Sequence, residues 1–150
     1  KINAEWVLSG KEAVESVVLA QNNGNSFDIC FIDWKMPEMD GLETVRQIRE
    51  KIGPDTPIII IQTLIRETGN FNQKARENVK RQNEAITEQV EVLRKKGVKN
   101  LYFIKEDHFL GTDHEGTIDG THPNDLGFDR MLKKYKPAIG KILKIKFRDK

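Results

Sequence analysis

The sequence has a single cysteine, Cys30, so no disulfide can form within the chain. Cys30 lies in an apolar run, and we interpret it as a buried thiol in a reducing compartment, which predicts a cytoplasmic protein. Long apolar runs are also missing. The longest, residues 58–61, is far too short to span a bilayer, and no signal-peptide pattern precedes it. The sequence therefore predicts neither a secreted protein nor a membrane protein.

Net charge is nearly absent, with 25 basic and 23 acidic residues. Such a balance produces no overall field that would attract nucleic acid or an anionic membrane. The lysines between Lys133 and Lys150 are interpreted as the solvated face and end of the last helix, not as a nucleic-acid patch. We therefore expect neither nucleic acid nor a membrane among the partners, and any partner must be recognised locally.

Short strand-like runs alternate with helix-like runs, a pattern typical of βαβ units on a parallel sheet. The predicted strands cover residues 4–8, 27–33, 57–63 and 100–105, and the predicted helices residues 11–21, 41–51, 74–96 and 124–143. The third helix carries an apolar stripe, predicted to be core, made of Ala75, Val79, Ile86, Val90 and Leu93. A length of 150 residues predicts one domain.

An apolar strand that ends in a carboxylate, followed by a turn containing Pro37 and Gly41, occupies residues 27–43. This run resembles the receiver domain of two-component response regulators and hybrid sensor kinases, and the resemblance covers residues 2–61. It implies that Asp33 is the phosphoacceptor. A carboxylate at the C-terminal end of a parallel strand also stands where such sheets bind ligands, and it can attack a phosphoryl group in line.

The same resemblance implies that a hydroxyl from Thr63 and the ammonium group of Lys105 contact the phosphoryl group. In receiver domains two further acidic residues on the first strand hold Mg²⁺, but this sequence begins at what resembles the second strand. One carboxylate, Asp33, is too few to hold Mg²⁺ tightly, so we predict a partial and weak Mg²⁺ site. A histidine kinase is expected as a partner only if receiver function survives.

An aspartate and a histidine three residues apart, Asp119 and His122, lie in a loop that runs into the last predicted helix. Such a pair can orient an imidazole and transfer a proton in a serine hydrolase. Residues 117–127 resemble the last block of SGNH (GDSL-type) hydrolases, which include esterases and carbohydrate deacetylases, and the resemblance covers residues 62–144. It implies that Asp119 and His122 are the catalytic dyad.

The nucleophile of that family has no counterpart in the sequence. The family carries its serine in a Gly-Asp-Ser motif after the first strand, whereas the serines present are Ser9, Ser16 and Ser26. The family's oxyanion-hole glycine and asparagine belong to the same replaced region. Because these parts act as a unit, we predict an orphan dyad that is almost inert toward esters.

The two resemblances meet inside the predicted strand 57–63. Both families share a flavodoxin-like architecture with strand order 2-1-3-4-5, so we expect a single α/β domain of three layers, α/β/α, whose first strand is missing. We interpret the chain as a recombined, engineered chimera without a complete active site, receiver-derived over residues 1–61 and hydrolase-derived over residues 62–150. A natural fusion and a mistaken gene assembly both stay open. Two other functions also stay open, a phosphorelay module phosphorylated on Asp33 and an SGNH-type esterase or deacetylase.

Two smaller features complete the prediction. The polar cluster formed by His108, Asp113, His114 and Glu115 matches no strong metal-ligand spacing and is interpreted as a solvated loop. The expected gap in the sheet would expose more apolar surface than monomers usually tolerate. We therefore expect a homodimer that covers this gap.

Overall fold

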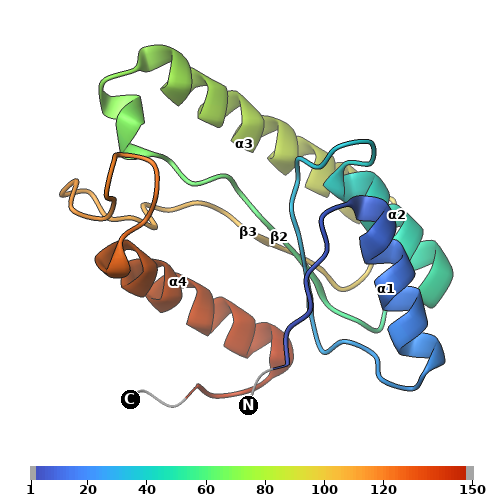
Figure 1. Ribbon diagram of the computed structural model, residues 1–150. Helices are drawn as coiled ribbons and strands as arrows, with labels where there is room; N and C mark the ends of the chain where they lie inside the picture. Colours follow the sequence, from blue (N-terminus) through green and yellow to red (C-terminus); the bar gives the residue numbers. More distant parts are fainter. Residues whose placement is uncertain (1–2, 148–150) are drawn as a thin grey trace. The chain divides into compact units, whose positions relative to one another are not determined.

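The computed structural model describes residues 3–147 and shows an α/β fold (Figure 1). Its sheet has three strands in the order β1-β2-β3, formed by β1 (Cys30–Ile32), β2 (Ile58–Ile61) and β3 (Leu101–Ile104). β1 and β2 are parallel, with Cys30 opposite Ile58 and Ile32 opposite Ile60. The flavodoxin-like α/β fold class predicted from the sequence is confirmed.

All four predicted helices are present, and each end lies within one residue of its predicted position. They are α1 (Gly10–Asn22), α2 (Gly41–Ile52), α3 (Gln73–Lys95) and α4 (Asp125–Leu143), to which the structure adds a short 3₁₀ helix, η1 (Glu67–Asn70). The side chains of Ser9, Asp40 and Asn124 accept hydrogen bonds from the first turns of α1, α2 and α4. These caps satisfy backbone donors that a helix leaves without partners, which explains why the helix starts are predictable.

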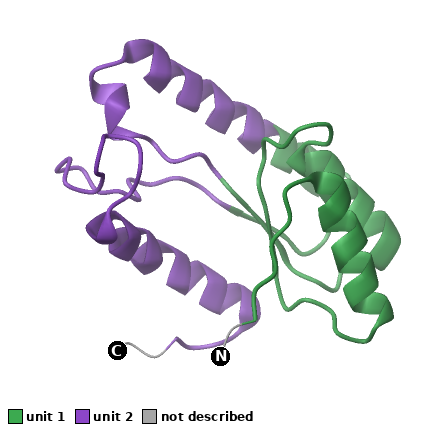
Figure 2. Cartoon of the chain, viewed as in Figure 1, with its two compact units in different colours: residues 1–61, 89–103 green, residues 62–88, 104–150 purple. Residues whose placement is uncertain are grey.

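The chain forms two compact units, coloured separately in Figure 2. Unit 1 contains residues 1–61 and 89–103, and unit 2 contains residues 62–88 and 104–150. The single-domain organisation stays a prediction.

Unit 1 is built around β2, whose Ile58, Ile59 and Ile60 are all fully buried. Successive residues of a strand point to opposite faces, so both faces of β2 are covered. α1 packs against α2 through Gly10, where an added Cβ would lie 2.2 Å from the Thr44 hydroxyl oxygen. The core of this unit therefore depends on a close approach of two helices as well as on the sheet.

The predicted strand at residues 4–8 does not form. Among residues 3–9 there is no strand, and the side chains of Trp6 and Leu8 are 81% and 75% exposed. The amide of Leu8 instead donates to the Glu12 carboxylate at 3.0 Å. Alternating apolar residues favour a strand only where a neighbouring strand supplies hydrogen bonds, so the pattern alone was insufficient.

Cys30 is half-buried, less deeply than the sequence suggested. Desolvation nevertheless raises the pKa of its thiol to about 11, against a smaller opposing effect of the Arg49 charge. The thiol therefore stays protonated near neutral pH, which makes it a poor nucleophile.

Unit 2 has a smaller core in which Ile86, Phe109 and Leu110 are buried. The rings of Phe109 and Tyr135 meet edge to face, with centroids 5.0 Å apart. Burial, followed by the charge of Glu106, raises the pKa of Tyr135 to about 12. Of the predicted apolar stripe on α3, Ile86 is buried in this unit, whereas Ala75 and Val79 are only partly covered. Val90 and Leu93 are buried and belong to unit 1.

Candidate active site

Asp119 and His122 are joined as the sequence predicted, in the loop that precedes α4. The Nδ1 atom of His122 lies 2.7 Å from Oδ2 of Asp119. The other oxygen of Asp119, Oδ1, accepts the backbone N–H groups of Thr121 at 2.9 Å and His122 at 2.8 Å. The two carboxylate oxygens therefore have separate partners, one in the imidazole and one in the backbone.

These hydrogen bonds keep Asp119 ionised. They lower the pKa of its carboxyl group to about 2, with the backbone bond from His122 as the largest cause and the imidazole bond next. An ionised carboxylate accepts hydrogen bonds only, so Nδ1 of His122 must be the nitrogen that carries the proton. Nε2 is then the basic nitrogen, on a side chain that is 76% exposed, as a general base requires.

The dyad loop is held as a narrow turn. Thr117 and Pro123 form an antiparallel bridge, and the amide of Ile118 donates to the His122 carbonyl oxygen at 2.9 Å. At its tip Gly120 has φ +78°, and an added Cβ would lie 2.9 Å from Cγ2 of Thr68. A residue with a side chain at position 120 would therefore suffer both backbone strain and crowding.

Asn124 ties the loop to α4. Its Nδ2 donates to the carbonyl oxygens of Glu115 at 2.7 Å and Thr117 at 3.3 Å, while its Oδ1 accepts the Gly127 amide at 2.9 Å. One side chain thus caps the helix and closes the base of the loop. The sequence indicated a helix start here, but it gave no sign of the contacts to the loop.

Two residues of η1 also contact the dyad loop and were not predicted to do so. The amide of Thr68 donates to the Gly120 carbonyl oxygen at 2.9 Å. The carboxylate of Glu67 accepts the Gly116 amide at 3.3 Å and the hydroxyl of Thr117. No sequence signal could have revealed these contacts, because about 50 residues separate the partners.

A cavity of about 820 Å³ lies in unit 2 between residues 62–70 and the first part of α3. Gln62 organises its polar side: its amide donates to the Asn83 carbonyl oxygen at 3.1 Å and to the Thr87 hydroxyl at 2.9 Å, and its Oε1 accepts the Glu106 amide at 2.8 Å. Neither residue of the dyad lines this cavity. Cavity volume alone identifies no reaction, so the cavity does not indicate where the chemistry occurs.

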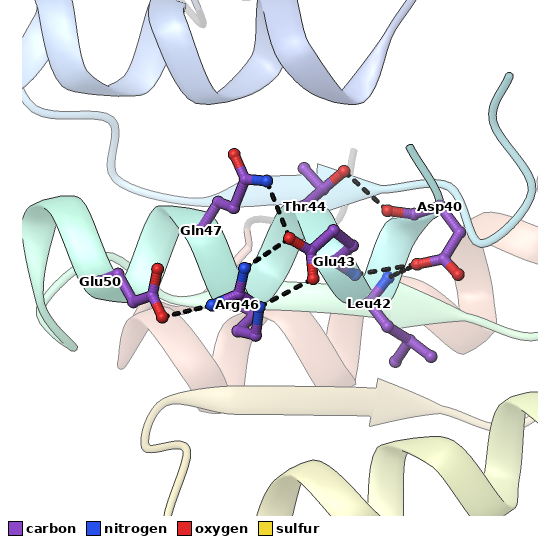
Figure 3. Close-up of polar contacts among 7 residues, drawn as sticks. All are labelled: Asp40, Leu42, Glu43, Thr44, Arg46, Gln47 and Glu50. Carbon is purple, nitrogen blue, oxygen red and sulfur yellow. Dashed lines mark hydrogen bonds and ion pairs between the residues drawn. The ribbon is translucent and has the colours of Figure 1, made fainter. Parts of the chain in front are cut away.

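Asp33 lies where predicted, directly after β1 in unit 1, with an exposed side chain. Its Oδ1 accepts the Lys35 amide at 3.3 Å. The following turn leads into α2, in whose first turn the N–H groups of Leu42 and Glu43 donate to Asp40 at 3.0 and 2.8 Å (Figure 3). The carboxylate is therefore accessible at the C-terminal end of a parallel strand.

The remaining polar groups of α2 form a surface network (Figure 3). Arg46 bonds both Glu43 and Glu50, and Gln47 donates to Glu43 at 2.8 Å. The hydrogen bond from Arg46, ahead of the one from Gln47, lowers the pKa of Glu43 to about 2. Exposed pairs of this kind add little stability, and their partners are all on one helix, so we assign them no catalytic role.

Thr63 and Lys105 both belong to unit 2. The backbone of Thr63 exchanges two hydrogen bonds with the Asn83 side chain, both of 2.9 Å, and Thr63 lines the cavity. Lys105 follows β3 and is exposed. Their contact with a phosphoryl group on Asp33 stays a prediction.

Among residues 3–147 no group of three or more His, Cys, Asp or Glu side chains is arranged to hold a metal ion. In the predicted solvated loop, Asp113 pairs with Arg130 at 2.5 Å and His114 bonds Asn70 at 3.0 Å. The weak Mg²⁺ site at Asp33 stays a prediction. Within the same described range, no helix has the length and apolar character needed to cross a membrane.

Sequence comparison decides the family. Residues 35–140 match the family model described as GDSL-like Lipase/Acylhydrolase family. The chain belongs to this family. It is also similar to a solved Bacteroides ovatus protein described as a GDSL-like lipase, with a TM-score of 0.70 and 67% identity, over 94% of this chain and 34% of that one. The chain thus spans about a third of the length of its GDSL-like relative.

The same chain is similar to receiver-containing proteins. It is 41% identical over 64 residues to a Chemotaxis protein CheY homolog of Campylobacter jejuni, covering 42% of this chain and 48% of that protein. It is 32% identical over 59 residues to the Osmosensing histidine protein kinase SLN1 of Saccharomyces cerevisiae, covering 39% of this chain and 5% of the kinase. Both predicted resemblances, to receiver domains and to GDSL-type hydrolases, are therefore confirmed.

Proposed function

We propose that this chain carries the acid–base half of a GDSL-type acyl-hydrolase site, with His122 as the base and Asp119 as the residue that orients it. The observation that carries the proposal is the 2.7 Å contact between Nδ1 of His122 and Oδ2 of Asp119. In ester cleavage, Nε2 of His122 would take the proton of an attacking hydroxyl and return it to the leaving alcohol. Membership of the GDSL-like family supports this chemistry.

The nucleophile is the part that unit 2 lacks. Every serine of the sequence, namely Ser9, Ser16 and Ser26, belongs to unit 1. Ser9 already serves as the cap of α1, where its hydroxyl oxygen accepts the Glu12 amide at 3.2 Å. We therefore propose that the chain is a recombined chimera whose hydrolase site is incomplete, and that it does not turn over simple esters. A cytoplasmic location is proposed with it, from the single cysteine.

The state of the imidazole nitrogens tests the dyad directly. In ¹⁵N-labelled protein, at a pH where the His122 ring is neutral, we expect the proton on Nδ1. Asp119→Asn keeps a carbonyl oxygen for the backbone N–H groups but places an amide donor against the ring, so the proton should move to Nε2. The sequence has three histidines, and a His122→Gln variant assigns the signal. A wild-type ring protonated on Nε2 would contradict the proposal.

A second function has its own observation. Asp33 presents an exposed carboxylate after a parallel strand, and the chain is similar to receiver-containing proteins. We propose that Asp33 accepts a phosphoryl group weakly, and that a histidine kinase is the donor where this function survives. Mg²⁺ with beryllofluoride is the probe. Weak binding that disappears in Asp33→Asn is expected, whereas equal binding by that variant would contradict the assignment.

A further inference from the structure

Glu67 is the one residue of η1 whose side chain bonds the dyad loop at two points. Its Oε1 accepts the Gly116 amide at 3.3 Å, and its Oε2 accepts the hydroxyl of Thr117. Glu67 is only partly exposed. The carboxylate thus uses both oxygens on the loop segment that leads into the dyad.

The hydroxyl of Thr117 connects Glu67 to the turn, because it bonds both the Glu67 carboxylate and the Gly120 amide. Its oxygen accepts the Gly120 amide at 3.0 Å, so its own proton must point to another acceptor. Glu67 supplies that acceptor, because the Thr117 hydroxyl donates to its Oε2. The direction of every hydrogen bond from Gly120 through Thr117 to Glu67 is therefore fixed.

The Gly120 amide belongs to the peptide that joins Asp119 to Gly120, so this chain of bonds sets the orientation of the peptide next to the dyad carboxylate. The following peptide is held as well, because the Gly120 carbonyl oxygen accepts the Thr68 amide at 2.9 Å. Adjacent residues of η1 thus fix both peptide planes that flank Gly120. Two restrained planes leave the turn little freedom to rotate.

We propose that Glu67 is a positioning residue for the dyad, acting through Thr117 on the peptide that carries Asp119. The inference rests on the proposed function of Asp119 and His122. Glu67 touches no reacting atom. Its role is to hold the turn in which Oδ1 of Asp119 stays on the backbone and Oδ2 stays on the imidazole.

The test compares ¹⁵N-labelled full-length wild type with Glu67→Ala, Thr117→Val and Thr117→Ser. Two quantities are followed in each protein: the share of His122 protonated on Nδ1, and the amide exchange rate of Gly120. Thr117→Val is nearly isosteric and removes the hydroxyl, whereas Thr117→Ser keeps it. Glu91→Gln, at an exposed position on α3, is the matched control for loss of a carboxylate.

Glu67→Ala and Thr117→Val should speed Gly120 exchange about tenfold and lower the Nδ1-protonated share, because the first removes the final acceptor and the second removes the hydroxyl that links it to the Gly120 amide. Thr117→Ser and Glu91→Gln should match wild type. If Glu67→Ala fails to fold, the same two quantities compared between Thr117→Val and Thr117→Ser test the positioning role.

Variants that lose thermal stability yet keep wild-type tautomer and exchange would overturn the positioning role and leave the dyad standing. A wild type protonated on Nε2 would instead remove the dyad, and this inference with it.

Discussion

Replacing Gly41 by alanine tests whether α2 is held against the strand end that presents Asp33. An added Cβ would lie 2.3 Å from the Asp33 carbonyl oxygen and 3.0 Å from Cα of Trp34, both backbone atoms. Ordinary contacts are at 3.4 Å or more, so the helix start and the strand end would have to separate by about 1 Å. The amide of Gly41, which donates to the Trp34 carbonyl oxygen at 3.0 Å, would be strained in the same movement.

The expected magnitude follows from three opposing effects. Alanine is better than glycine inside a helix by about 1 kcal/mol. Overpacking against atoms that cannot rotate away costs about 1 to 3 kcal/mol, and a weakened hydrogen bond costs about 1 kcal/mol. We expect Gly41→Ala to lower the free energy of unfolding by about 1 to 3 kcal/mol, although helix propensity alone predicts a gain.

Urea unfolding followed by fluorescence measures this change. The sequence has two tryptophans, so a Trp6→Phe background leaves Trp34 as the reporter beside the substituted position. Gly53→Ala is the control: it lies at the other end of α2 with φ +74°, and an added Cβ meets nothing within 4 Å. It should cost about 1 to 3 kcal/mol from backbone strain without changing native Trp34 emission. A Gly41→Ala protein as stable as wild type, with unchanged emission, would refute the reasoning.

Three further predictions concern the dyad and the assembly. Aryl and acetyl esters should be hydrolysed at the background rate; hydrolysis that disappears in His122→Ala would show that a nucleophile is present after all. The folded-state pKa of Asp119 is lowered to about 2. Its hydrogen bonds to the backbone should therefore persist as the pH falls through the ordinary aspartate range, and be lost only as the pH falls through about 2. The amide shifts of Thr121 and His122 report this, and a midpoint near 3.8, the ordinary value, would contradict it. The homodimer predicted from the gap in the sheet stays a prediction, and light scattering that gives a monomer at micromolar concentration would exclude it.

The helices were predictable because their signals are local. Asp40 before Gly41, and Asn124 before α4, are capping residues at the first turn of an amphipathic pattern, and each acts within three or four residues. The strand at residues 4–8 failed for the opposite reason. Its apolar pattern is local too, but a strand also requires a partner elsewhere in the chain, which no local pattern specifies.

The contacts of the candidate site also fall into local ones, which were predictable, and distant ones, which were not. Asp119 and His122 lie three residues apart, and their bond was predictable from spacing and residue type. The contacts of Glu67 and Thr68 with the dyad loop span about 50 residues, and the sequence gives no reason to prefer them to others. η1 itself is a single turn, too short for a periodic signal.

The short spacing of the dyad has a consequence for how such a site can be inherited. A bond between residues three apart closes a very small loop, so its formation costs little chain entropy. The bond between Asp119 and His122 is local to one turn, whereas the restraints on that turn come from Glu67 and Thr68, about 50 residues earlier in the chain. In the proposed chimera the junction lies before Glu67, so the dyad and the residues that restrain its turn would be inherited together.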